Sequence, residues 1–201
     1  MFVQVIRGRV AEPEPVHAAF DAWSRQLAPD APGWLGSAAG VTEDGRFIAL
    51  ARFDSEDAAR RNEHRPEQGQ WWQETSKLFS GDVTFRDSDD VVADVHGDPN
   101  NAGFLQVMQG RGTDPERAKE LMAENPDEWA EFRPDVIGSL AMGHEGGNYT
   151  MATYFSSEQA AREGERKEPP PELKAQMEEM NKLSVGETEF LDVRDPWLYS
   201  P

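Results

Sequence analysis

The chain has 201 residues and a formal net charge of −18, which repels phosphate backbones and anionic lipids. We therefore expect neither a nucleic-acid partner nor a membrane partner, and the lack of cysteine excludes disulfides, thiolate nucleophiles and cysteine-bound metals. No apolar run approaches the length of a membrane-spanning helix and no leader-like segment precedes the first strand, so a cytoplasmic location is expected.

The first predicted elements are a strand, a helix and a pair of strands. A short apolar run over Phe2–Gly8 predicts a strand that ends at a glycine. Apolar residues recur every three or four positions over Pro13–Ala28, which predicts a helix with one apolar face. Trp34–Val41 and Arg46–Phe53 are predicted strands, and Glu43–Gly45 between them is typical of a hairpin turn.

Two helices and a strand complete this half of the chain. Ser55 suits the N-cap of a short helix, because its hydroxyl can accept a hydrogen bond from a backbone amide of the first turn. Pro66 suits the first turn of a second helix that runs to about Phe79. With a last strand over Asp82–Asp87, the predicted order of elements is β-α-β-β-α-β.

The second half of the chain repeats the first. Residues 2–65 match residues 104–167 at a constant offset of 102, with 21 identities in 64 positions, against roughly four expected from average residue usage. After the proline run at 169–171 the offset becomes 105. We predict a first repeat at 1–88, a linker at 89–103, a second repeat at 104–195 and a C-terminal tail at 196–201.

The second copy has the same predicted order of elements. Its first helix is interrupted at Asn125–Pro126, because proline removes a helical hydrogen bond. Its strands are predicted at Phe104–Gly110, Val136–Gly143, Asn148–Phe155 and Glu187–Val193.

The repeated order is the ferredoxin-like split βαβ pattern, in which helices cover one face of the sheet and leave the other apolar face bare. A bare apolar face must find a partner. We therefore predict an α+β fold in which two ferredoxin-like repeats pack sheet to sheet as a barrel within one chain. Such a chain would be a monomer built like a dimer, and further self-association stays open.

A known family shares this organisation. The stretch FDSEDAARRNEHRPEQGQWW at Phe53–Trp72 contains a strand, a short helix, a turn with a histidine and an aromatic helix. Together with the element order and the length of each copy, it resembles the dimeric α+β barrel superfamily, in particular antibiotic-biosynthesis-monooxygenase-like domains. That superfamily includes cofactor-free oxygenases of polyketide quinols, haem-degrading enzymes and proteins with no demonstrated catalysis.

The resemblance implies a cofactor-independent monooxygenase-like protein acting on a small aromatic or polyketide-like substrate, such as a quinol or an anthrone. The resembling haem enzymes use an axial histidine on the second helix, whereas His64 precedes that helix and the helix itself contains none. No cofactor is therefore expected. No metal is expected either, because the four histidines are scattered and form neither His-x-His nor His-Glu-x-x-His.

The two copies differ where a ligand site is expected. The turn before the second helix carries Asn62 and His64 in the first copy, but glycine and arginine in the second. Arg86 on the last strand becomes a leucine. We predict these three as catalytic residues, because asparagine and arginine can hydrogen-bond a phenolate or a carbonyl and an imidazole can move a proton near pH 7.

Aromatic and amide side chains are expected to bind the substrate. Trp34, Trp71 and Trp72 would stack on an aromatic ring, and Gln4 and Gln106 occupy matching positions in apolar strands. Structural roles stay open for all of these residues. The histidine can be a solvated turn residue, the strand arginine can pair with an acid, one of two adjacent tryptophans belongs to the core, and the glutamines can make structural hydrogen bonds.

The alternative function is a non-catalytic barrel that binds a small hydrophobic ligand or a protein partner. An enzyme requires an enclosed cavity lined by at least two of Asn62, His64, Trp72 and Arg86. An interaction module instead has a filled interior and an exposed apolar patch.

Overall fold

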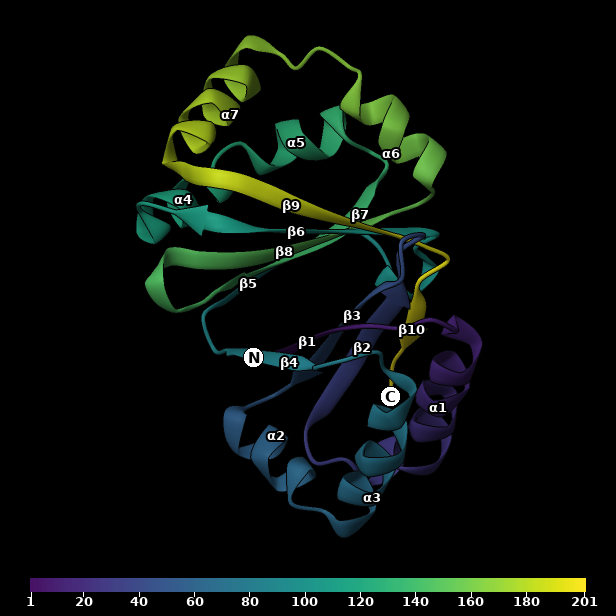
Figure 1. The fold of residues 1–201 in the computed structure, drawn as a ribbon. Helices are drawn as coiled ribbons and strands as arrows, with labels where there is room; N and C mark the ends of the chain where they lie inside the picture. Colours follow the sequence, from purple (N-terminus) through teal and green to yellow (C-terminus); the bar gives the residue numbers. More distant parts are fainter. The chain divides into compact units, whose positions relative to one another are not determined.

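The computed structural model describes all residues from Met1 to Pro201 (Figure 1). The chain divides into two compact units, and the second lies inside the first in sequence. Unit 1 comprises Met1–Val91 and Val193–Pro201, and unit 2 comprises Val92–Asp192. None of the helices combines the length and the apolar character that crossing a membrane requires.

Unit 1 contains a five-stranded antiparallel sheet and three α-helices (Figure 1). The strand order is β10-β2-β3-β1-β4. The strands are β1 (Phe2–Arg9), β2 (Trp34–Val41), β3 (Arg46–Phe53), β4 (Thr84–Ser88) and β10 (Trp197–Tyr199). The helices are α1 (Pro13–Gln26), α2 (Glu56–Glu63) and α3 (Pro66–Thr75), with short 3-10 turns η1 (Ala28–Asp30) and η2 (Ser76–Leu78).

Unit 2 repeats this arrangement with the strand order β5-β7-β8-β6-β9. The strands are β5 (Val91–Val95), β6 (Phe104–Gly112), β7 (Val136–Gly143), β8 (Asn148–Phe155) and β9 (Ser184–Arg194). The helices are α4 (Pro115–Met122), α5 (Pro126–Phe132), α6 (Glu158–Glu165) and α7 (Pro171–Leu183), with 3-10 turns η3 (Pro99–Asn101) and η4 (Glu145–Gly147). The predicted interruption of the first helix is confirmed, since Asn125 between α4 and α5 has a left-handed φ of 54°.

Two strands were not predicted from the sequence. The predicted linker contains β5, which lies beside β7, and the predicted tail contains β10, which pairs with β2. A strand of three residues such as β10 is too short to show an alternating pattern, and its partner is more than 150 positions away in sequence, as the pair Trp197 and Ala39 shows. The predicted repeat boundaries stay a prediction.

The helices of unit 1 pack on one face of its sheet. Phe2 and Ile6 of β1 point to this face, and α1 buries Val16, Phe20 and Trp23 against it. Burying each such side chain stabilises the fold by roughly 1.5–3 kcal/mol. The helix side of unit 1 is therefore a core rich in aromatic rings.

Candidate functional site

The turn between α2 and α3 is shaped by local sequence signals. Ser55 caps α2, because its Oγ accepts a hydrogen bond from the amide of Ala58 at 3.3 Å. His64 is the C-cap of α2, and Pro66 stands in the first turn of α3, where a missing amide hydrogen costs nothing. Two residues, His64 and Arg65, therefore join two rigid helices.

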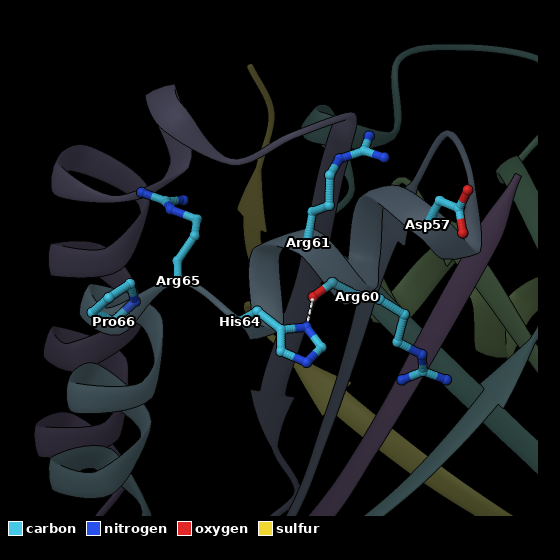
Figure 2. Close-up of a pocket in the computed structure, with 6 residues that line it drawn as sticks. All are labelled: Asp57, Arg60, Arg61, His64, Arg65 and Pro66. Atoms are coloured by element: carbon cyan, nitrogen blue, oxygen red, sulfur yellow. Dashed lines mark hydrogen bonds between the residues drawn. The ribbon is translucent and has the colours of Figure 1, made fainter.

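A hollow of about 600 Å³ lies at this turn and opens widely to solvent (Figure 2). It is lined by Asp57, Arg60, Arg61, His64, Arg65 and Pro66. Three of these residues are arginines and one is an aspartate, although the whole chain carries a net charge of −18. Carboxylates offset the charge of Arg60, so Arg61 and Arg65 are the cations that suit a negatively charged group.

The ring of His64 is held by one hydrogen bond. Its Nδ1 lies 2.6 Å from the carbonyl oxygen of Arg60, the contact drawn as a dashed line in Figure 2. A carbonyl oxygen can only accept, so Nδ1 carries the hydrogen. In the neutral ring, Nε2 is then the basic nitrogen, and the side chain is exposed to solvent. His64 can therefore take a proton from a ligand in the hollow.

The side chain of Arg60 is already held by hydrogen bonds within the fold. Its guanidinium donates to Asp87 at 2.6 Å, to Glu63 at 3.1 Å and to Glu56 at 3.2 Å. The hydrogen bonds that Arg60 donates to Asp87 and then to Glu63 raise the pKa of Arg60 above its ordinary value. Because three carboxylates surround this guanidinium, it has little capacity left for a ligand.

Arg65 and Arg61 differ in how many hydrogen bonds their side chains make within the protein. Arg65 Nη1 donates to the carbonyl oxygen of Leu27 and to Oδ1 of Asn62, both at 3.0 Å. These bonds fix the side chain and leave its Nη2 and Nε without a partner in the structure. Arg61 is exposed and makes no hydrogen bond or ion pair. Arg61 is therefore the cation of the hollow most available to an anion.

The structure places six of the predicted site residues on the helix side of unit 1. Asn62 is buried, with 4% of its surface exposed, and holds Arg65 rather than facing the hollow. Gln4 donates through Nε2 to Oε1 of Glu63 on α2, which is a structural hydrogen bond. Of the residues predicted to be catalytic, only His64 lies on the wall of the hollow.

The three predicted tryptophans belong to the aromatic core. Trp34 is buried and donates through Nε1 to Oγ of Ser37 at 3.0 Å. Trp71 donates through Nε1 to the carbonyl oxygen of Ala19 at 3.0 Å. Trp72 is half-buried and packs edge-on against Phe85, with ring centroids 5.3 Å apart. The ring nitrogens of Trp34 and Trp71 thus already have partners inside the fold.

Arg86 and Gln106 are not brought to the hollow. Arg86 stands opposite Val5 in the pairing of β4 with β1, while its neighbour Phe85 stands opposite Ile6. Paired residues share a face of the sheet, and Ile6 belongs to the helix-side core. Arg86 therefore points to the other face. Gln106, in unit 2, donates through Nε2 to Oδ1 of Asp192 at 2.9 Å.

Sequence reasoning missed the arginines of the hollow. The stretch Arg60–Arg65 reads RRNEHR and has three arginines and a histidine among its six residues. This density of cations in an acidic chain was a signal that a positive site lies here. The residues predicted for the site are ones that can line a closed cavity, whereas the hollow is open to solvent.

No protein family model matches the sequence, and no curated protein matches it. Solved structures do match. A candidate monooxygenase from Lactobacillus acidophilus NCFM aligns with a TM-score of 0.76 at 11% identity and covers 99% of this chain and 95% of its own. An anthrone oxidase-like protein aligns with a TM-score of 0.68 at 11% identity and covers 99% of this chain and 92% of its own.

A third match is a major regulator of staphylococcal pathogenesis, with a TM-score of 0.56 at 8% identity, covering 97% of this chain and 99% of its own. At these identities the likeness concerns the fold alone. The fold is α+β, with two antiparallel five-stranded sheets, and over nearly the whole chain it is shared with the solved structures described as a monooxygenase and as an anthrone oxidase-like protein. The predicted fold class and the predicted resemblance to this fold are confirmed.

Proposed function

We propose that this chain is a cofactor-independent monooxygenase-like protein that oxygenates a small aromatic substrate, such as a quinol or an anthrone, bound as its anion in unit 1. The observation that carries the proposal is the α2–α3 hollow, which combines an unpaired arginine, Arg61, with the basic Nε2 of His64. The likeness to an anthrone oxidase-like protein supports the reaction class.

The proposed roles follow from the geometry. His64 Nε2 accepts the acidic proton of the substrate, and Arg61 and Arg65 stabilise the anion that forms. The anion then passes electrons to oxygen. For an anthrone, one CH₂ group and one O₂ become one C=O group and one water, so the substrate supplies all the electrons. Asn62 is a positioning residue in this scheme, because it holds Arg65.

The other predicted site residues enter the proposal differently. A stacking role for Trp72 stays a prediction, because Trp71 and Trp72 are both half-buried on α3 and neither lines the hollow. A role for Arg86 stays a prediction, and the proposed steps do not use it. A cytoplasmic location and a monomeric state also stay predictions.

A second candidate is binding of a small hydrophobic ligand or a protein partner without catalysis. The hollow is open rather than enclosed, and only His64 of the four residues expected around a cavity lines it. Phe85 is 46% exposed beside Trp72, which gives unit 1 an apolar surface next to α3. The likeness to a regulator of pathogenesis also shows that this fold serves proteins described by other roles.

Oxygen uptake with a panel of quinols and anthrones separates the two candidates. Wild type is compared with His64→Ala, Trp72→Ala and the matched control Arg166→Ala, which alters the equivalent exposed turn of unit 2. We expect wild type and the control to consume oxygen, and His64→Ala to be about 100-fold slower in kcat. Binding of a panel compound without oxygen consumption would favour the second candidate, and no binding at all would oppose both.

A further inference from the structure

Arg61 and Arg65 at the α2–α3 hollow are two cations that pair with no carboxylate. Arg61 is exposed and makes no ion pair, and both hydrogen bonds of Arg65 go to neutral oxygens. In Figure 2 both side chains extend to the same side of the turn, whereas the ring of His64 lies toward Arg60. We propose that Arg61 and Arg65 bind a phosphate dianion, as inorganic phosphate or as the end group of a phosphate monoester, and that this ligand excludes the aromatic anion from the hollow.

The side chain of Arg65 is held in place before any ligand binds. Its Nη1 donates to the carbonyl oxygen of Leu27 and to Oδ1 of the buried Asn62. A side chain that the fold already fixes loses little conformational entropy when it binds an anion. The remaining Nε and Nη2 donate in parallel along one edge of the planar guanidinium, and two oxygens of one phosphoryl group can accept from that edge.

Arg61 supplies the second guanidinium. It stands four positions before Arg65, in the last turn of α2, so the two side chains begin about one helical turn apart. A phosphate monoester carries a charge of about −1.5 to −2 at pH 7 and has three acceptor oxygens, which suits two guanidiniums. A carboxylate has a single charge and fewer oxygens, so the free edge of Arg65 alone satisfies it. The pair therefore favours phosphate over carboxylate.

The shape of the hollow restricts recognition to the phosphoryl group. The hollow opens widely to solvent, and Pro66 is the only apolar residue on its wall. The organic part of a phosphate monoester therefore stays in solvent. Asp57 is the only carboxylate on the wall, and its like charge weakens the binding of any anion.

The equivalent turn of unit 2 keeps the backbone conformation without the arginine pair. The backbone hydrogen bond from the amide of Arg65 to the carbonyl oxygen of Asn62 recurs between Lys167 and Gly164, at 3.1 Å in both units. The residue that matches Arg61 is a glutamate, and the glycine has no side chain to hold the neighbouring cation. Because the turn forms without two arginines, the fold does not require them, and a ligand accounts for their presence in unit 1.

Titration with inorganic phosphate at constant ionic strength tests the binding without any turnover. The side-chain Nε resonances of Arg61 and Arg65 report the Kd by NMR. We expect Arg61→Glu, an exposed substitution that copies unit 2, to weaken binding at least about ten-fold. Lys167→Ala is the matched control in unit 2 and should bind like wild type. Asp57→Asn should bind several-fold more tightly, because it removes the carboxylate from the wall.

Two further anions test the ligand class. Phenyl phosphate should bind wild type within about three-fold of inorganic phosphate, because its ring finds little apolar surface to cover. Acetate should bind at least about ten-fold more weakly than phosphate. The proposal is overturned if wild type binds no phosphate, if acetate binds as tightly, or if Arg61→Glu binds phosphate as wild type does.

The exclusion of the aromatic anion rests on the proposed oxygenation, whereas the binding of phosphate does not. With a quinol or anthrone that wild type oxygenates, inorganic phosphate should raise KM and leave kcat unchanged. His64→Ala should lose oxygenation and still bind phosphate, because the ring is held toward Arg60. Phosphate binding by a protein that oxygenates no compound would overturn the proposed function alone. Oxygenation that does not respond to phosphate would overturn this inference alone.

Discussion

The guanidinium Nη2 of Arg60 lies 2.6 Å from Oδ2 of Asp87, and the same ion pair recurs in unit 2 between Arg162 and Asp192. Each arginine also lies over a phenylalanine that begins a strand, with 5.6 Å to the ring centroid of Phe2 in unit 1. The pair joins the helix that follows the β-hairpin to the edge strand of its sheet. Because both units contain it, we assign it to the fold rather than to a ligand site.

The residues of the hollow are not repeated in this way. At the offset of 102, Arg61 is matched by a glutamate, Asn62 by a glycine and His64 by an arginine. A feature that both units need for folding is expected in both, whereas a binding site is needed only once. The contrast supports unit 1 as the place of the ligand site.

The Arg60–Asp87 pair gives the first prediction. We expect Asp87→Asn to lower the free energy of unfolding by about 1 kcal/mol, since both side chains are partly exposed and screened by salt. Asp192→Asn should have a similar effect in unit 2. Urea denaturation measures both, with the exposed Asp82→Asn as a control that should change little. A control effect as large as that of Asp87→Asn would show that the pair adds no stability.

Tyr199 gives a prediction about pH. Burial and then the hydrogen bond to Asp21 raise the pKa of Tyr199 above its ordinary value. Because the pKa of Tyr199 is higher in the folded state, the stability that its phenol contributes is fully present below about pH 10, the pKa in the unfolded chain. This stability is lost as the pH rises through the pKa of the folded state. We expect absorbance at 295 nm to show one late-ionising tyrosine in wild type that is missing from Tyr199→Phe, and identical titration curves would contradict the assignment.

Gln176 gives a prediction for unit 2. It is buried, donates through Nε2 to the carbonyl oxygens of Leu121 and Glu124, and accepts through Oε1 from the indole of Trp129 at 2.9 Å. Gln176→Leu takes a hydrogen-bond partner from four groups, which are the carbonyl oxygens of Leu121 and Glu124, the indole of Trp129 and the side-chain amide of Asn125. We therefore expect a loss of about 2–4 kcal/mol in unfolding free energy. The exposed neighbour Met177→Leu should change it by less than about 0.5 kcal/mol. Chemical denaturation of the two variants, measured side by side, tests the expected difference in unfolding free energy.

Two glycines of unit 1 should respond in opposite directions to alanine. Gly33 has a φ of 60°, and an added Cβ would press on the carboxylate of Asp54, so Gly33→Ala should destabilise by about 1–3 kcal/mol. Gly69 lies inside α3 with open space around it, so Gly69→Ala should stabilise by about 0.5–1 kcal/mol. Thermal unfolding should move the midpoint down for the first and up for the second. A shift in the same direction for both would contradict this account of the backbone.

Much of the fold could be predicted from the sequence. The alternation in Arg46–Phe53, the apolar face of Pro13–Gln26 and the breaker at Asn125 are local signals, because side-chain direction follows the backbone period. The repeat within the chain then indicated the fold class. The candidate site was harder to predict from the sequence, because contacts between residues far apart in the chain decide which face of a strand meets the helices. Arg86 and Gln4 illustrate this on β4 and β1.

The sequence by itself determined where most of the strands and helices form, that the same order occurs twice, and that Asn62 and His64 stand at a turn that differs between the copies. Only the tertiary structure decided that β5 and β10 complete the sheets, that Trp197 fills the aromatic core, and that Arg61 lies open beside His64. The physical reason is the separation along the sequence over which each effect acts. Backbone period and capping act over a few residues, whereas strand pairing and ring packing join residues far apart in the chain.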